Sequence, residues 1–180
     1  EGYLAAGMAA QARAAAGEEK ERAELDGGQV VPPSDAQIPA CRNYRITDET
    51  LGAGGEKTKY QYNVAAIRTL KQIEAEGRFA TPEEQEILAK YVGWGGLAQA
   101  FDPKDRKWAK EYAALRELLS PEEYKSAQGS VLNAHYTSPA IIQAIYQAVE
   151  RMGFRPGNIL EPSCGVGNFF GLLPESMSGA

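Results

Sequence analysis

The feature that most limits the fold of this chain is a glycine-containing segment near its end, residues 159–170, which reads ILEPSCGVGNFF. A short strand is predicted over 158–161, and a helix is predicted from about Gly167 to Leu173. Gly165 and Gly167 have no Cβ, so the backbone between these two elements can turn sharply and approach another group closely. A parallel sheet needs several strand–helix units, and only one is present. We therefore expect a mainly α fragment that carries the first β-α element of an α/β domain.

The rest of the chain divides into three predicted regions. Residues 1–40 combine an Ala-rich charged stretch, 3–25, which favours a helix, with a Gly- and Pro-containing linker, 26–40. Residues 41–130 are predicted to be a helical N-terminal region, and 131–180 the truncated start of the α/β domain. The chain begins with Glu1 and ends in a bland segment, so both ends are expected to be cuts within a longer protein.

Helix boundaries in the middle region are marked by local signals. Apolar residues from Tyr60 to Ile73 recur at helical spacing over 59–76, and Gly77 offers a stop. Thr81 and Ser120 each precede Pro-Glu-Glu, the pattern of a capping box, and predict helices over 81–92 and from 120 onward. Further helices are predicted over 105–119 and over 138–153, and residues 43–47 alternate like a short strand.

Charge and cysteine content narrow the function classes. The net charge is −5, and residues 1–40 hold seven acidic and three basic side chains, so −4 of it lies there. A free-standing DNA-binding domain is usually basic, so the acidic net charge argues against DNA binding by this chain alone. Cys41 and Cys164 are far apart and there is one histidine, so no zinc site is expected. The chain has no secretory signal and no apolar run that would span a membrane, and we expect a cytoplasmic protein.

The glycine segment itself favours a nucleotide-type ligand. A loop that leads into a helix N-terminus suits either a phosphate or the methionine part of S-adenosylmethionine. A dinucleotide fingerprint would need a third glycine where Phe170 stands, and the Gly-Lys-Ser/Thr of a P-loop is absent. The alternative is an ordinary strand-to-helix turn with no ligand.

The pattern acid-Pro-x-x-Gly-x-Gly-x-Phe, which begins at Glu161, resembles the first cofactor motif of S-adenosylmethionine-dependent methyltransferases. Upstream, residues 136–139 (Tyr-Thr-Ser-Pro) are similar to the Tyr/Phe-x-Thr-Pro segment of adenine-type DNA methyltransferases, with one Ser inserted. Capping of the helix that starts at Pro139 also explains this Ser or Thr. The resemblance implies a Rossmann-like methyltransferase domain and S-adenosylmethionine as cofactor. The implied cofactor-binding residues are Tyr136, Thr137, Glu161, Ser163, Cys164, Gly165, Gly167 and Phe169.

A wider resemblance, over about residues 43–173, is to the N-terminal part of the large methylase–helicase proteins of conjugative elements and phages. It implies methylation of DNA at adenine, a helicase domain in the same parent chain, and protection of mobile DNA from restriction. The segments that carry this resemblance are residues 43–47, 91–97, 133–137 and 159–170.

The family's catalytic motif, Asn/Asp-Pro-Pro-Tyr/Phe, does not occur in the sequence. By the resemblance, it is expected in the parent protein beyond Ala180. We therefore assign no catalytic residue to the chain and expect the fragment to be inactive alone.

Two other functions stay open from the residues alone. The helical region, about 59–130, could be a non-catalytic module that positions DNA or a helicase, or the methyltransferase could act on RNA or protein.

Trp94, in Gly-Trp-Gly-Gly, is either a stacking platform for a base or an anchor of the turn in the core. The second interpretation is favoured because large aromatic side chains are mostly buried.

Overall fold

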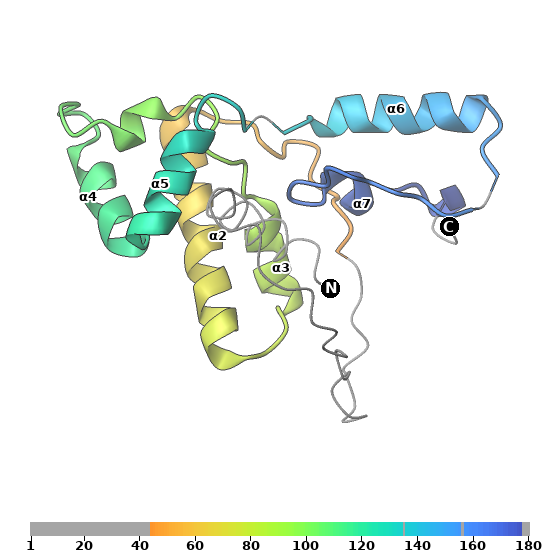
Figure 1. The fold of residues 1–180 in the computed structure, drawn as a ribbon. Helices are drawn as coiled ribbons and strands as arrows, with labels where there is room; N and C mark the ends of the chain where they lie inside the picture. Colours follow the sequence, from red (N-terminus) through yellow and green to blue (C-terminus); the bar gives the residue numbers. More distant parts are fainter. Residues whose placement is uncertain (1–43, 135, 156, 178–180) are drawn as a thin grey trace, which may run out of the picture.

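The computed structural model describes residues 44–134, 136–155 and 157–177, so the predicted N-terminal helix and linker lie outside the described residues. Figure 1 shows α2 to α5 grouped on one side and α6 with α7 on the other. The elements in chain order are α2 (Glu56–Glu76), α3 (Pro82–Ala89), the 3-10 turn η1 (Ala98–Phe101), α4 (Ala109–Leu118), α5 (Pro121–Ser130), α6 (Pro139–Arg151), α7 (Asn168–Gly171) and the 3-10 turn η2 (Glu175–Met177).

The longest helix, α2, forms the centre of the larger group. Its apolar residues at helical spacing are buried, as predicted, and they share one core with side chains from α3, α4 and α5. Gly77 follows the helix with a φ of 61°, and its amide bonds the Glu74 and Ile73 carbonyls, so the predicted stop is confirmed. The buried stripe consists of Tyr60, Asn63, Val64, Ala66, Ile67, Leu70 and Ile73.

Both predicted capping boxes are present. Thr81 accepts a hydrogen bond from the Glu84 amide and Ser120 from the Glu123 amide, and each glutamate reaches back to the amide of its cap. α3 ends at Ala89 and α4 begins at Ala109, so both helices are shorter than their apolar pattern suggested. Helix ends are satisfied by these local bonds, which is why the sequence alone located the two starts well.

Aromatic rings fill the core between α2, η1, α4 and α5. Trp94 lies with its ring centroid 5.3 Å from that of Phe101, at a near-perpendicular angle. Trp108 meets Tyr60 edge-on at 5.8 Å. Trp94 is 2% exposed, so the interpretation of this residue as a core anchor is confirmed and the stacking platform is wrong.

The predicted strands are absent. Among residues 44–134, 136–155 and 157–177 the structure contains helices and turns but no strand, so the predicted β-α element of a Rossmann-like domain is not formed. Residues 159–161 form no ladder, and Leu160 is 86% exposed. The segment from Tyr44 lies instead against the end of α7, where the Ile46 amide donates to the Gly171 carbonyl at 2.8 Å. A strand is stable only with a hydrogen-bonded neighbour, and neither segment provides one for the other.

The smaller group consists of α6 packed on the glycine segment and α7. α6 begins at Pro139 as predicted, and its Ile142 is fully buried. Ile141 and Ile145 of the same helix are 55% and 42% exposed, although both are large apolar side chains. None of the helices in the described ranges has both the length and the apolar character required to cross a membrane.

Candidate functional site

The glycine segment turns tightly between its start and α7. Gly165 and Gly167 have φ values of 53° and 85°, a left-handed conformation that glycine adopts without the clash of a Cβ. The Gly167 amide donates to the Cys164 carbonyl at 2.8 Å and closes the turn. Val166 between the two glycines is 1% exposed and belongs to the same core as α2 to α5. The turn is therefore held by a buried side chain at its tip.

The helix that follows is much shorter than predicted. α7 covers only four residues, Asn168–Gly171, where the sequence predicted a helix from about Gly167 to Leu173. Gly167 is its N-cap and makes no side-chain capping bond. A single turn has only a small dipole, so the attraction of a long helix N-terminus for an anion is not available here. Any ligand at this turn would depend on side chains and on single backbone amides.

Tyr136 lies directly against Gly165. A Cβ placed on Gly165 would be 2.9 Å from Tyr136 Cε1, closer than side chains approach one another. The two segments that the resemblance joins into one site are therefore in contact. The tyrosine is half-buried and packs against the main core.

The opposite edge of the same ring lies against Gly93. A Cβ on Gly93 would be 2.7 Å from Tyr136 Cε2, and Gly93 also has a positive φ, 72°. The Tyr91 ring lies beside them, with its centroid 6.4 Å from that of Tyr136. Burial raises the pKa of Tyr91, and the neighbouring Tyr136 hydroxyl adds to this effect. Two glycine turns far apart in sequence thus enclose one aromatic ring.

Buried Asn63 of α2 fixes the backbone next to Gly93. Its Nδ2 donates to the Gly93 carbonyl at 2.6 Å, and its Oδ1 accepts from the Val92 amide at 2.9 Å. Asn63 is fully buried. The sequence pattern predicted no role for Asn63, although an asparagine three positions after Tyr60 falls on the apolar stripe of α2, which is a usable signal.

The acidic residue of the predicted motif, Glu161, forms a hydrogen bond within its own loop. Glu161 Oε1 accepts a hydrogen bond from the Ser163 amide at 3.0 Å. The carboxylate also lies near Tyr146 of α6. Burial raises the pKa of Tyr146, and the negative charge of Glu161 raises it further. Ser163 is exposed, and Glu161 is half-buried.

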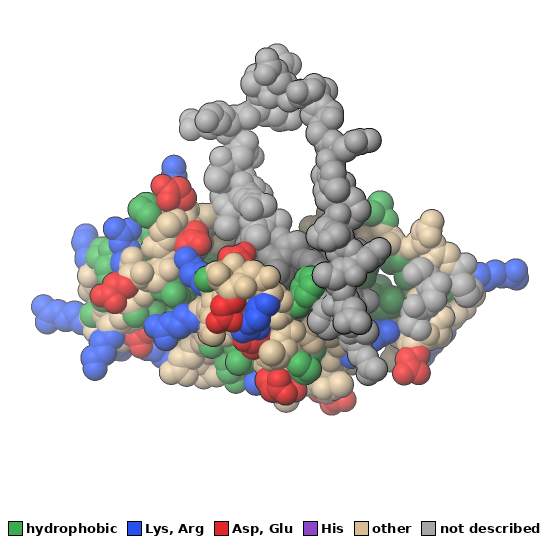
Figure 2. Space-filling model, turned by 90° about the horizontal axis from the view of Figure 1, so that it is seen from below, with side chains coloured by type: hydrophobic (Ala, Val, Ile, Leu, Met, Phe, Trp, Pro, Cys, Tyr) green, Lys and Arg blue, Asp and Glu red, His purple; other side chains and the backbone are tan. Residues whose placement is uncertain are grey.

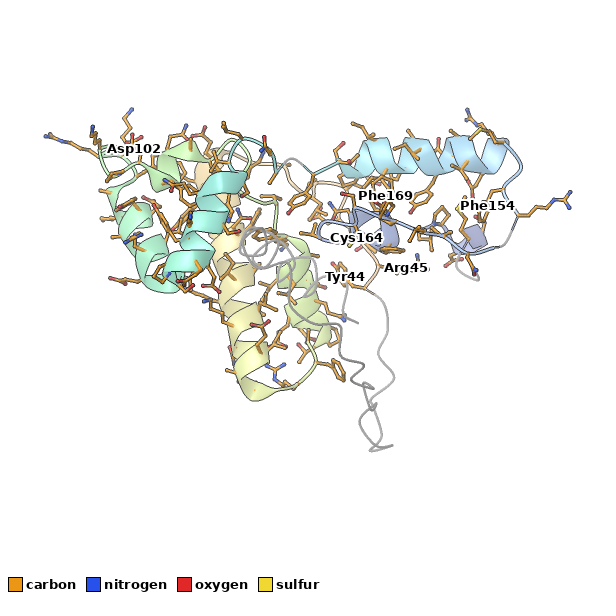
Figure 3. The ribbon with its side chains drawn as sticks, in the orientation of Figure 1. Tyr44, Arg45, Asp102, Phe154, Cys164 and Phe169 are labelled. Atoms are coloured by element: carbon orange, nitrogen blue, oxygen red, sulfur yellow. The ribbon has the colours of Figure 1, made fainter. Side chains whose placement is uncertain are left out.

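The remaining predicted residues lie around the turn. The Phe169 ring meets Tyr146 edge-on at 6.1 Å, and the Tyr146 hydroxyl donates to the Phe169 carbonyl at 2.7 Å. Figure 3 shows Cys164 and Phe169 on the glycine segment below α6. Thr137 is half-buried in the approach to α6. Ser138 occupies the N-cap position of α6 but makes no capping bond, so the expected side-chain cap at this position is wrong.

The expected catalytic motif is not part of this arrangement. It was predicted beyond Ala180, and Ala180 itself lies outside the described residues, which end at Met177. The motif therefore stays a prediction about the parent protein. What the described residues contribute to a site is limited to the glycine turn and its neighbours.

A shallow pocket of about 370 Å³ is found elsewhere, between η1 and the end of α5, and is lined by residues such as Phe101, Asp102 and Val131. The three described ranges hold no group of three or more His, Cys, Asp or Glu side chains placed to bind a metal ion. On the face drawn in Figure 2, basic and acidic side chains are interspersed and no broad basic surface stands out. The glycine turn with Tyr136 is therefore the arrangement that best matches the predicted site.

Comparison with known proteins adds no relative: no protein-family model, curated protein or solved structure matches this chain.

Proposed function

We propose that this chain is the cofactor-binding front part of an S-adenosylmethionine-dependent DNA methyltransferase that acts at adenine. The parent protein would be of the methylase–helicase kind and serve a mobile element. The observation that carries the proposal is the contact of Tyr136 with Gly165, which joins the two sequence segments that the motif resemblance requires side by side.

Each side chain has a role that its chemistry allows. The Glu161 carboxylate, half-buried beside the turn, would meet the ammonium group of the methionine part. Exposed Ser163 and the backbone around Gly165 and Gly167 would line the same end, and Thr137 would help Tyr136 close it. Phe169 would support the turn from behind by its contact with Tyr146 of α6.

The proposal assigns cofactor binding and no methyl transfer to these residues. The sequence contains no Asn/Asp-Pro-Pro-Tyr/Phe motif to hold a target amine. Transfer depends mainly on holding the sulfonium methyl in line with that amine, and a bound cofactor alone does not achieve this. The chain by itself is therefore expected to bind S-adenosylmethionine without turnover.

A second candidate is a non-catalytic helical module for DNA or a helicase partner. It is favoured by one observation: Tyr136 fills the space beside Gly165, so packing alone accounts for the glycine there. The core that α2 to α5 share forms from protein side chains alone, with Val166 of the glycine turn among them. The two candidates differ in whether the turn binds a cofactor.

Calorimetric titration of S-adenosylmethionine into the chain distinguishes them. The wild type is expected to bind, and Glu161→Gln and Gly165→Ala to weaken binding at least tenfold. Matched controls are Glu117→Gln, an exposed carboxylate of α4, and Gly129→Ala in α5, where a Cβ meets nothing within 4 Å. No heat of binding, or equal binding by all five proteins, would remove the cofactor site and leave the helical module.

A further inference from the structure

Tyr136 belongs to neither glycine turn, yet its position depends on both. Atoms Cε1 and Cε2 lie on opposite edges of the ring. Cε1 is close to the position that a Cβ on Gly165 would take, and Cε2 is close to that of a Cβ on Gly93. The ring cannot move toward Gly93 or toward Gly165 without meeting main-chain atoms. A side chain held on two edges occupies one place, and interiors packed this tightly transmit a displacement from one neighbour to the next.

The Gly93 side of this contact is the more firmly fixed of the two. Tyr91 and Trp94, on either side of residues 92–93, are 7% and 2% exposed. Asn63 bonds the amide of Val92 and the carbonyl of Gly93, so α2 holds both backbone groups. A shift of this turn would break the bonds to Asn63 and leave buried polar groups without partners. That cost keeps the turn in place.

The Gly165 side is built differently. The turn is closed by the Gly167–Cys164 hydrogen bond and anchored by Val166, while Ser163 and residue 162 on its approach are exposed. The rest of its surroundings come from α6, from α7 and from the segment 44–47, whose Ile46 amide donates to the Gly171 carbonyl at the end of α7. The direct contacts of this turn with the α2–α5 core are therefore those of Val166 and of the ring of Tyr136, while Ile46 holds the far end of α7.

We infer that Asn63 and Gly93 are positioning residues: they fix the ring of Tyr136, and the ring in turn fixes the glycine turn at Gly165. The helical region thereby sets the geometry of the candidate cofactor site, which would give the Gly-Trp-Gly-Gly segment a role that stacking on a base does not supply. The link to cofactor affinity rests on the proposed function, whereas the mechanical link between the two turns does not.

The test uses the amide of Gly167 as its reporter, because its hydrogen bond to the Cys164 carbonyl closes the turn. Hydrogen exchange of this amide is followed by NMR in the wild type, in Gly93→Ala and in Gly96→Ala. Gly96 has a similar φ, 75°, but a Cβ there meets nothing within 4 Å, so it reproduces the backbone strain without the collision. Gly93→Ala is expected to speed exchange at Gly167 at least tenfold, and Gly96→Ala to change it less than twofold.

Removing the ring provides the second arm. In a Tyr136→Ala background a methyl group at position 93 has no ring to push, so Gly93→Ala should no longer alter exchange at Gly167. Tyr136→Ala alone should shift the amide signals of both Gly93 and Gly165 while leaving that of Gly77 unchanged. This arm remains informative even if Gly93→Ala fails to fold, because Tyr136 is only half-buried.

Equal exchange in Gly93→Ala and Gly96→Ala would overturn the inference, as would a signal shift at only one of the two glycines. Titration of S-adenosylmethionine separates it from the proposed function. If the exchange results hold and no variant or wild type binds the cofactor, the positioning network stands and the methyltransferase proposal fails. If the wild type binds and Gly93→Ala does so equally well despite faster exchange, the network does not serve the cofactor site.

Discussion

Replacement of Trp94 by alanine measures how much this buried side chain contributes to the stability of the core. The indole is 2% exposed, and its ring meets Phe101 at 5.3 Å and Tyr60 at 6.2 Å. Truncating a buried tryptophan costs about 3–5 kcal/mol, because it removes buried apolar area and leaves a cavity. Each aromatic pair adds roughly 0.5–1.5 kcal/mol beyond its area. A small domain is stable by only about 5–15 kcal/mol, so Trp94→Ala should lose a large share of the free energy of unfolding.

The assay is equilibrium unfolding in urea followed by far-ultraviolet circular dichroism. Tryptophan fluorescence is unsuitable because the chain has two tryptophans and the substitution removes one of them. Trp94→Phe should fall between wild type and alanine, since it keeps a smaller ring in the same place. Phe79→Ala is the matched control: this ring is 52% exposed, and its removal should change stability by no more than about 0.5 kcal/mol.

The reasoning fails if Trp94→Ala lowers stability by less than about 1 kcal/mol, close to the size expected for a surface position.

Three further outcomes follow from local chemistry. Thr81→Ala should lower the free energy of unfolding by roughly 1 kcal/mol, measured in urea, because the Glu84 amide loses its cap. The bonds from Arg78 lower the pKa of Glu84 to about 2. The stability that the Glu84 carboxylate contributes is therefore present above its ordinary pKa and is lost as the pH falls toward 2. In Glu84→Gln the free energy of unfolding should depend less on pH over that range. Burial raises the pKa of Tyr60 to about 12, so ultraviolet titration should find a tyrosine that ionises well above pH 10, and Tyr60→Phe should remove its contribution.

The helical half of the fold was predictable because its signals are local. The Thr81 and Ser120 capping boxes each involve residues three apart, and Gly77 ends α2 through its own left-handed conformation. The apolar stripe of α2 needs only the helical period to be recognised. Helix ends were less accurate: α3 stops at Ala89, before the last apolar residue of its pattern.

The strand predictions were wrong for a nonlocal reason. The alternation over 43–47 and the predicted strand over 158–161 are local patterns that suit a strand, but a strand also requires a hydrogen-bonded partner strand. The 44–47 segment forms hydrogen bonds at the end of α7 instead. The Ile46 amide donates to the Gly171 carbonyl, and the Arg45 guanidinium donates to the Leu173 carbonyl. Periodicity had the same weakness in α6, where Ile141 stays exposed because no described element covers it.

The candidate site shows the same division between local and distant information. The bend at Gly165 and Gly167 was expected from the glycines alone, and the approach of Tyr136 was expected only through a family resemblance. The contribution of Asn63 and Gly93 was not predicted, because these two residues lie far apart in sequence and far from the turn that they support. Contacts of that range depend on how helices pack, which a single sequence does not state.

Gly165 has to accommodate the ring of Tyr136 and, in the proposed function, also a cofactor. The Cβ position is occupied by the edge of Tyr136, so a cofactor cannot use the space that the missing side chain leaves. What the turn still offers is the exposed Ser163 and the half-buried Glu161 carboxylate, which accepts a hydrogen bond from the Ser163 amide. A methionine moiety bound beside these residues would contact main-chain atoms that the ring of Tyr136 holds in place. In the proposed site the tyrosine would both close the methionine end and support the turn, and the glycine is required for that support even without a ligand.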